Sequence, residues 1–462
     1  MITEKRTMTS RRQLLCQAAG AAAAGSILKF AEPLVAAQPR FERVTFGSIN
    51  KYSAPSDLKI TDLRGCTVAA NYDYPIIRID TNQGVYGLGE VRDAGLLGMG
   101  LILKPMLVGR NPLQIEAVLR NIRQYAGQGR LGGGYSAVDM ALHDIAGKVY
   151  GVPAWRLIGN KQRDRIRIYC DTTGHKDPKV YGQRMLKRKQ MGFTFFKMDL
   201  YTSLVEGRPG AIHQNGTATA KGLGYLCEYI AAVRDAIGWG VPLGADHFGN
   251  LSVNDAIRYC KAFEPYQLAW AEDLISWRDW RGFKRITEST ETPTLTGENA
   301  FGLEEGFQDL IENNAVDLIQ PDPETSGALL ETKRIGDYAD KFGIPTVFHH
   351  AGSPVGAMAS VHCAATLRNF VVMENHAVDM PWWQDLVTGI PKPIIKDGYI
   401  QVPDTPGLGV ELNEEVVKKY LRYPGYFEPT PEFDKPILGG PRQRGPWWHY
   451  DEDGKWCNCV TY

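Results

Sequence analysis

The sequence predicts a parallel (β/α) barrel of the TIM type, preceded by a smaller α+β domain. Its 462 residues are enough for both parts, and 44% hydrophobic with 23% charged residues is ordinary for a soluble globular protein. The second half alternates short apolar runs with helical segments, which is the pattern of a closed parallel barrel. Three acidic residues end three successive runs at equal spacing, and such barrels carry their active sites where the strands end.

Residues 1–37 are predicted to be an export signal and not part of the fold. Arg11 and Arg12 precede an alanine-rich apolar run at 16–30, which is too short to span a bilayer, and 35–37 offer a cleavage site. An arginine pair before a mildly apolar run resembles a twin-arginine signal, which exports folded proteins. We therefore expect a periplasmic or secreted protein; the alternative is an ordinary amphipathic N-terminal helix.

The charge composition argues against polyanionic partners. Lys and Arg number 52, Asp and Glu number 52, and the formal net charge is +0. We therefore expect no nucleic-acid partner and no membrane attachment beyond export, and an anionic small substrate must be held by local charges.

The cysteines do not form a disulfide framework of the kind that small secreted domains use. Of the eight, Cys16 lies in the predicted signal, and the others are scattered along the chain. Cys457 and Cys459 form a thiol pair near the C-terminus, but two ligands without a second pair are a weak indication of zinc.

The α+β domain is predicted over residues 41–165. Two β-strands at 74–80 and 85–90 flank a short turn with Gly84, which predicts an antiparallel hairpin. Helices are predicted at 113–125 and 135–150, the second from apolar residues at helical spacing: Val138, Leu142, Ile145 and Val149.

The barrel is predicted over residues 166–407. The long polar connection at 201–226 is either a substrate loop or a surface insertion. We expect 408–462 to return to the N-terminal domain and to end in a tail rich in Pro, Gly and Trp. The eight predicted strands are 166–170, 195–200, 241–246, 268–272, 294–298, 316–321, 346–349 and 370–374.

Asp246, Glu272 and Glu298 are the predicted metal ligands. Each lies 26 residues after the one before (246 to 272, 272 to 298), about one β/α unit, so all three should converge at one end of the barrel. Three carboxylates with open positions suit Mg²⁺, which prefers hard oxygen ligands. The alternative for each residue is a solvated or helix-capping side chain.

Three segments and the order of these ligands resemble the mandelate racemase/muconate-lactonizing branch of the enolase superfamily. The segments are SAVDMALHDIAG at 136–147, the following Pro153 to Gly159, and TNQGVYGLGE at 81–90. The similarity covers approximately residues 58–410. It implies a modified TIM barrel under an N-terminal α+β capping domain, bound Mg²⁺, and abstraction of the α-proton of a carboxylate substrate.

His349 is the candidate base for that proton. It ends the seventh predicted strand, and Asp322 ends the sixth, where it is placed to hydrogen-bond the imidazole and raise its basicity. The pair resembles the family's His–Asp dyad, and the distance from Gly343 favours His349 over His350. The alternative is a structural histidine.

Lys197 and Glu374 are further candidates at strand ends. Racemases of the family carry a Lys-x-Lys pair with the second lysine as a base, but Asp199 stands at that position here, which argues against two-base racemisation. Lys197 then remains as a positive charge near the substrate carboxylate or the metal ligands. A glutamate at position 374 hydrogen-bonds the substrate carboxylate in the family. For both residues, the alternative is a salt bridge within the barrel.

His247 directly follows Asp246. Some sugar-acid dehydratases of this branch have a catalytic histidine one residue later, where Phe248 stands here. Strand alternation would turn His247 away from the site, whereas irregular backbone would bring it in.

One base, a metal triad and no second lysine favour dehydration over racemisation. The resemblance implies a sugar acid as the substrate, which dehydration would convert to a 2-keto-3-deoxy acid. His349 would take the α-proton, and the β-hydroxyl would leave with acid help from His349 itself or from His247. Epimerisation, racemisation or cycloisomerisation of a related acid is the alternative, and a non-catalytic periplasmic sugar-acid-binding protein is the alternative of another class. We expect a small carboxylate as the substrate and a homo-oligomer.

Overall fold

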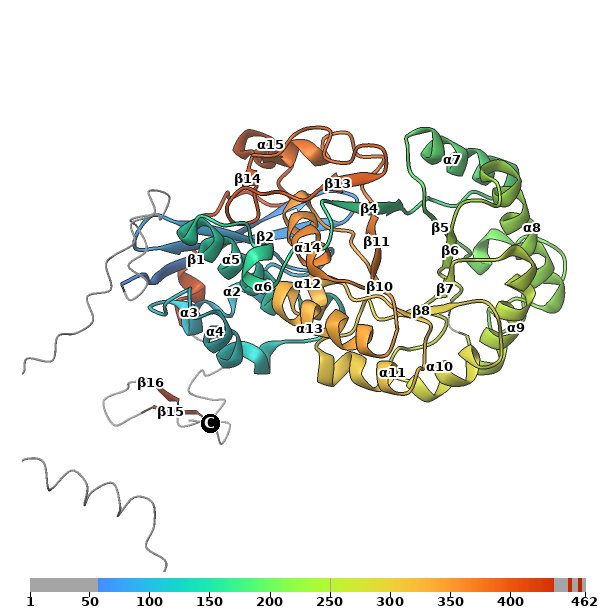
Figure 1. The fold of residues 1–462 in the computed structure, drawn as a ribbon, viewed down its shortest axis with the longest axis horizontal. Coiled ribbons are helices and arrows are strands. Elements are labelled where there is room, and N and C mark those ends of the chain that lie inside the picture. The colour runs from blue at the N-terminus through green and yellow to red at the C-terminus, as the bar shows by residue number, and fades with distance from the viewer. Residues whose placement is uncertain (1–56, 250, 436–447, 451–455, 459–462) are drawn as a thin grey trace, which may run out of the picture. The chain divides into compact units, whose positions relative to one another are not determined.

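The computed structural model describes residues 57–249, 251–435, 448–450 and 456–458 (Figure 1). The predicted export signal at 1–37 lies outside these residues, as do the first residues of the predicted N-terminal domain and Cys459. In the part of the chain that is described, no helix is long and apolar enough to cross a membrane.

A three-stranded antiparallel sheet and a long helix form the centre of the N-terminal α+β domain. The sheet has the order β1 (Ile60–Ala69), β2 (Asp73–Thr81) and β3 (Tyr86–Glu90), and α5 (Gly133–Tyr150) packs against β3. A Cβ atom on Gly89 would lie 1.9 Å from the carbonyl oxygen of Ala137, so glycine lets strand and helix approach closely. Shorter helices complete the domain: α2 (Gly98–Leu101), α3 (Lys104–Leu107), α4 (Ile115–Ile122) and α6 (Trp155–Ile158).

Eight parallel strands close into a barrel, because the last strand pairs with the first at Met373↔Ile168 and Glu374↔Tyr169. All eight predicted strands are confirmed, six of them shorter than predicted and the first and last one residue longer. They are β4 (Arg165–Cys170), β5 (Phe196–Asp199), β6 (Leu243–Asp246), β7 (Trp270–Glu272), β8 (Thr294–Thr296), β9 (Leu318–Ile319), β10 (Thr346–Phe348) and β11 (Phe370–Asn375).

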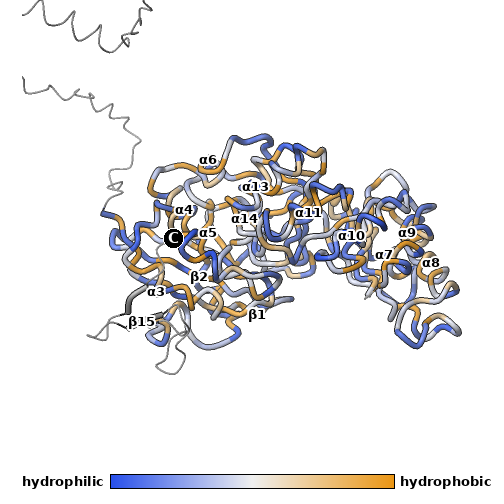
Figure 2. The backbone as a smooth tube through the Cα atoms, turned by 90° about the horizontal axis from the view of Figure 1, so that it is seen from below, coloured by the Kyte–Doolittle hydropathy of each residue, from blue (hydrophilic) through white to orange (hydrophobic). Residues whose placement is uncertain are grey.

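Helices surround the barrel (Figure 1), and hydrophobic and hydrophilic stretches alternate along the outer ones (Figure 2), as expected where one helix face packs on strands. They are α7 (Pro178–Gln190), α8 (Ala220–Ile237), α9 (Val253–Phe263), α10 (Trp280–Thr287), α11 (Gln308–Glu312), α12 (Pro323–Ser326), α13 (Ala328–Lys341) and α14 (Pro354–Thr366).

The long connection after β5 is shorter than the sequence predicts, because α8 begins at Ala220 and not after Leu226. Thr219 caps the helix by accepting a hydrogen bond from the Gly222 amide at 3.0 Å. The glycines of this first turn gave the segment the composition of a loop. A Cβ on Gly222 would lie 1.9 Å from the carbonyl oxygen of Ala211, so close packing against the connection requires glycine there.

After the barrel the chain returns to the N-terminal domain. The amide of Ala69 donates to the carbonyl of Tyr420, and that of Arg422 to the carbonyl of Thr67. This segment contains β12 (Val387–Thr388), β13 (Tyr399–Gln401), which pairs with β4, β14 (Glu411–Leu412) and α15 (Glu414–Lys419). Further on, β15 (Trp448–Tyr450) and β16 (Trp456–Asn458) form an antiparallel pair.

Aromatic and branched side chains fill the barrel directly beneath the predicted site. Trp270 packs against Phe195 and Tyr169 with ring centroids 4.9 and 5.5 Å away. The indole nitrogen of Trp270 donates to Glu272 Oε2 at 2.9 Å. The packed interior therefore supports the acidic residues from below.

Candidate active site

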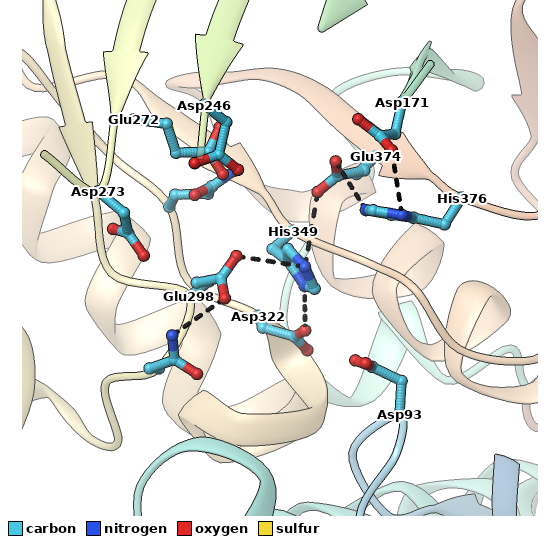
Figure 3. Close-up of polar contacts among 12 residues, drawn as sticks. Asp93, Asp171, Asp246, Glu272, Asp273, Glu298, Asp322, His349, Glu374 and His376 are labelled. Carbon is cyan, nitrogen blue, oxygen red and sulfur yellow. Dashed lines mark hydrogen bonds and ion pairs between the residues drawn. The ribbon is translucent and has the colours of Figure 1, made fainter. Parts of the chain in front are cut away.

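The predicted site residues meet at the carboxyl end of the barrel (Figure 3). Asp246 and Glu272 end β6 and β7, Glu298 lies two residues beyond β8, and His349 directly follows β10. Sequential strands thus bring residues more than a hundred positions apart to one place, as in other barrels.

Lys197 on β5 lies among three carboxylates. Its Nζ is 3.1 Å from Asp246 Oδ2, 3.3 Å from Glu272 Oε1 and 2.7 Å from Glu374 Oε1. Burial lowers the pKa of this lysine, but the three carboxylates outweigh burial and raise the pKa well above its usual value. Lys197 is therefore a permanent positive charge at the barrel mouth. The barrel salt bridge between Lys197 and Glu374 that the alternative interpretation expects is present.

Glu298 has different contacts from the other two predicted ligands. Its Oε2 lies 3.3 Å from His349 Nε2, its Oε1 accepts from the Asn299 side chain at 3.0 Å, and its side chain is 15% exposed. Among the described residues, the side chains that lie close enough together to bind one metal ion form other sets at the barrel mouth. One of these sets contains Asp246. The structure therefore brings Asp246 and Glu272 together at Lys197, whereas Glu298 contacts His349 and Asn299.

The charge balance nevertheless fits a divalent cation. Three carboxylates, those of Asp246, Glu272 and Glu374, share one lysine, and Glu298 adds a fourth carboxylate that lies beside His349 and Arg92. Burial raises the pKa of Glu272 well above its usual value, and repulsion from the neighbouring carboxylates, chiefly Asp246, adds to it against the attraction of Lys197. Oxygen donors alone, with excess negative charge, are the environment that Mg²⁺ prefers.

His349 and Asp322 form a buried pair. His349 Nδ1 is 2.5 Å from Asp322 Oδ2, whose position is fixed by Arg92 at 3.3 Å. We assign the Nδ1 proton to this contact, which leaves the Nε2 lone pair facing Glu298 and Glu374 across the opening. His350 instead lies 3.4 Å from Glu324. The two neighbouring histidines thus have different surroundings, and His349 is the one whose free nitrogen faces the carboxylates.

His247 reaches the site through irregular backbone. Its φ of 63° is left-handed, so the strand alternation that would turn it outward does not apply. Its Nδ1 lies 2.8 Å from Asp246 and 3.5 Å from Asp199, and 43% of the side chain is exposed. The histidine therefore covers the first predicted metal ligand from the solvent side.

Four residues at the site were missed from the sequence. Arg92 comes from the loop after β3, Asp273 from the residue after Glu272, and His376 and Asp171 from the ends of β11 and β4. Strand periodicity could have indicated His376, because it lies two residues after Glu374 and so on the same side. No local pattern indicates Arg92, whose partners at the site, Glu298, Asp322 and Thr325, lie more than 200 residues away.

Arg92 connects the N-terminal domain to the dyad, and its removal should destabilise the protein. The guanidinium is fully buried, with Nε 2.6 Å from Asp93 and one NH group donating to the Glu298 carbonyl at 2.7 Å and to Thr325 Oγ1 at 2.7 Å. We expect Arg92→Met to lower the free energy of unfolding by about 3–5 kcal/mol, because carboxylates stay buried without their partner.

Urea unfolding followed by tryptophan fluorescence measures this loss. Arg422→Met is the matched control, because Arg422 pairs with Asp73 at the surface and should leave the unfolding free energy nearly unchanged. Equal stability of the Arg92 variant and the wild type would contradict the role of Arg92 as the buried connection.

Fold and site together define a carboxylate-rich barrel enzyme with an α+β domain over the barrel mouth. Residues 63–159 match the mandelate racemase/muconate lactonizing enzyme N-terminal domain, and 181–416 match the enolase C-terminal domain-like family. The chain therefore belongs to the mandelate racemase/muconate-lactonizing branch of the enolase superfamily, and the resemblance expected from the sequence is confirmed.

Several relatives are sugar-acid enzymes. The chain is 32% identical over 388 residues to D-xylonate dehydratase of Haloferax volcanii, covering 82% of this chain and 92% of the relative. A mandelate racemase/muconate lactonizing enzyme-like protein from Rubrobacter xylanophilus aligns with a TM-score of 0.74 at 29% identity, over 80% and 99% of the two chains. The 3,6-anhydro-D-galactonate cycloisomerase from Zobellia galactanivorans aligns with a TM-score of 0.68 at 27% identity, over 79% and 100%. The chain is thus an enzyme similar to sugar-acid dehydratases.

Proposed function

We propose that this enzyme dehydrates a sugar acid to a 2-keto-3-deoxy acid with the help of Mg²⁺. The observation that carries the proposal is the geometry of His349, whose Nδ1 is held by Asp322 and whose Nε2 faces the carboxylate cluster. A single well-oriented base opposite a cation site suits removal of one α-proton. The name of the D-xylonate dehydratase relative supports the substrate class.

Asp246, Glu272 and Glu298 would hold the metal. Bound there, Mg²⁺ would stabilise the negative charge that develops on the substrate carboxylate as the α-proton leaves. Lys197 adds a fixed positive charge on the same side, and Glu374, which it holds at 2.7 Å, is placed to accept a hydrogen bond from a substrate carboxyl or hydroxyl group.

His349 takes the α-proton at Nε2. Asp322 stabilises the imidazolium that results, and Arg92 keeps Asp322 in place at 3.3 Å. Asp199 lies where a second lysine base would be needed for racemisation, and its carboxylate accepts a hydrogen bond from Tyr201 at 2.8 Å. Loss of the β-hydroxyl then gives an enol that becomes the 2-keto product.

A screen of sugar acids tests this proposal. Purified protein with Mg²⁺ is incubated separately with D-xylonate, D-gluconate and D-galactonate, and keto acids are measured with a carbonyl reagent and mass spectrometry. We expect a product lighter by one water from at least one acid. Absence of a keto acid from a broad library would contradict dehydration.

Cycloisomerisation or epimerisation is the second candidate, favoured by the aligned cycloisomerase structure. Mass spectrometry separates the two, because an isomerised product keeps the mass of its substrate whereas a dehydrated product does not. Binding of an acid without any α-proton loss would instead favour a non-catalytic sugar-acid-binding protein.

We also propose that residues 1–37 direct export by the twin-arginine route. The support is the arginine pair before an apolar run too short to span a bilayer. Fractionation of cells that express the full chain, beside an Arg11→Lys, Arg12→Lys variant, tests this. Equal distribution of both proteins in the cytoplasm would contradict export.

A further inference from the structure

A second imidazole–carboxylate pair lies beside Glu374. His376 follows the end of β11, and Asp171 follows the end of β4, the strand that closes the barrel against β11. His376 Nδ1 is 3.5 Å from Asp171 Oδ2, and His376 Nε2 is 3.0 Å from Glu374 Oε1 (Figure 3). The closing strand pair of the barrel thus positions both partners.

This pair repeats the arrangement of His349 and Asp322. In each pair Nδ1 faces an aspartate, and Nε2 faces Glu374, at 3.7 Å for His349 and 3.0 Å for His376. Atoms of the two imidazoles and of Glu374 lie within 4.8 Å of one another, and the ring centroids are 5.8 Å apart. Two oriented imidazoles therefore face one small volume from different sides.

A polar atom that faces this volume is left for a ligand. Glu374 Oε2 is buried and makes no hydrogen bond of good geometry with any described residue, whereas Glu374 Oε1 lies 2.7 Å from Lys197 Nζ and 3.0 Å from His376 Nε2. Unpaired buried polar atoms are costly, and in an active site they are the atoms that substrate hydroxyl or carboxyl groups engage.

The N-terminal domain also contacts His376. Tyr72 meets the imidazole edge-on with ring centroids 5.8 Å apart, and the Asn71 side chain donates to the His376 carbonyl at 3.3 Å. Only 11% of the His376 side chain is exposed. The ring is therefore fixed by two domains and shielded from bulk water.

The charges around His376 favour its protonated form. Burial lowers its pKa, but the carboxylates of Glu374 and Asp171 outweigh burial and raise the pKa to about 9. Neither carboxylate belongs to the predicted metal triad, so both remain to stabilise the imidazolium. At neutral pH His376 is therefore protonated. It lies near His349, which must be unprotonated to act as the base.

We propose that His376, oriented by Asp171, is the general acid that protonates the departing β-hydroxyl. The proposal rests on the dehydratase function above. His349 removes the α-proton, and the electron pair of that C–H bond forms the double bond between the α- and β-carbons. The bond from the β-carbon to oxygen breaks towards oxygen, which takes the His376 Nε2 proton and leaves as water. His349 releases its proton to solvent and His376 regains one from solvent. The enol becomes the keto acid by gaining a proton at the β-carbon and losing its hydroxyl proton to solvent.

His247 is the other histidine at the mouth. It lies 2.8 Å from Asp246, a predicted metal ligand, and almost half of its side chain is exposed. A proton carried there would face the bound cation. His376 is more buried and lies against carboxylates outside the metal triad, which suits a proton donor better.

The test compares two leaving groups in the Mg²⁺-loaded enzyme. His376→Asn and His376→Gln are assayed with the hydroxy acid that the wild type dehydrates and with its 3-deoxy-3-fluoro analogue, because fluoride leaves without general-acid help. We expect dehydration to fall at least about 100-fold and fluoride release to stay within about tenfold of wild type. In D₂O, the variants should exchange the α-hydrogen of recovered substrate, because His349 still acts. Asp171→Asn should show the same pattern to a smaller extent.

Each other outcome has a distinct meaning. Dehydration at the wild-type rate by both His376 variants would overturn the acid role. An equal decrease of dehydration and of fluoride release would overturn it too. The fluoride-rescued pattern in His247→Asn but not in the His376 variants would assign the acid to His247. A wild type that dehydrates no acid would remove the proposed function itself. His175→Asn, in the loop before α7, is the control and should behave as wild type.

Discussion

Replacement of His349 by asparagine is expected to abolish keto-acid formation, with a loss of about 10²–10⁴-fold in kcat/KM. The variant keeps a side chain of similar size but has no group that accepts a proton at neutral pH. Asp322 and Arg92 would still be paired at 3.3 Å, so the surrounding network should survive. The measurement is keto-acid production together with α-deuterium exchange in D₂O, and both should disappear.

The loss of exchange separates this variant from those of His376. A base variant should lose exchange and elimination together, whereas an acid variant should keep exchange. Thermal unfolding and Mg²⁺ binding of His349→Asn should remain close to wild type. Full activity of a folded His349→Asn protein would show that another group removes the proton.

Replacement of Glu272 by glutamine is expected to remove both metal binding and activity. Loss of an outer hydrogen-bond partner of a metal site costs about 10–100-fold, so loss of a ligand should cost more than about 100-fold. The amide oxygen of glutamine can still accept the Trp270 indole hydrogen bond, which is 2.9 Å long in the wild type. The fold beneath the site should therefore remain intact.

Stability gives a second readout for this variant. Mg²⁺ at a hundred times its Kd should stabilise the wild type by about 2.7 kcal/mol, and this gain should vanish in Glu272→Gln. Without metal, the variant should be at least as stable as the wild type, because removal of this charge relieves repulsion from Asp246. Glu288→Gln, at the surface after α10, is the matched control. Unchanged Mg²⁺ stabilisation in Glu272→Gln would contradict its place among the ligands.

Much of the fold could be predicted because the barrel repeats one simple pattern. Each strand is a short apolar run, and the charged residues at the ends of β6 and β7 indicated which end carries chemistry. The equal spacing of the acidic residues indicated that they lie at the ends of successive strands. Local patterns of this kind lie within one β/α unit, so sequence reasoning can find them.

Contacts between distant segments could not be predicted in the same way. Arg92 reaches Asp322 from another domain, and nothing near position 92 indicates that partner. The orientation of Glu298 towards His349 depends on side-chain rotamers that spacing does not determine. The left-handed backbone of His247 likewise depends on its surroundings, since β-strand alternation alone predicts an outward side chain.

Release of the α-hydrogen is the central step of the proposed reaction. The direct measurement is release of deuterium to water from a 2-deuterated sugar acid, D-xylonate first, with Mg²⁺ and with excess EDTA. We expect rapid release with Mg²⁺, none with EDTA, and none from His349→Asn. Conversion of the acid without α-deuterium release, or equal release in EDTA, would contradict metal-assisted α-proton abstraction.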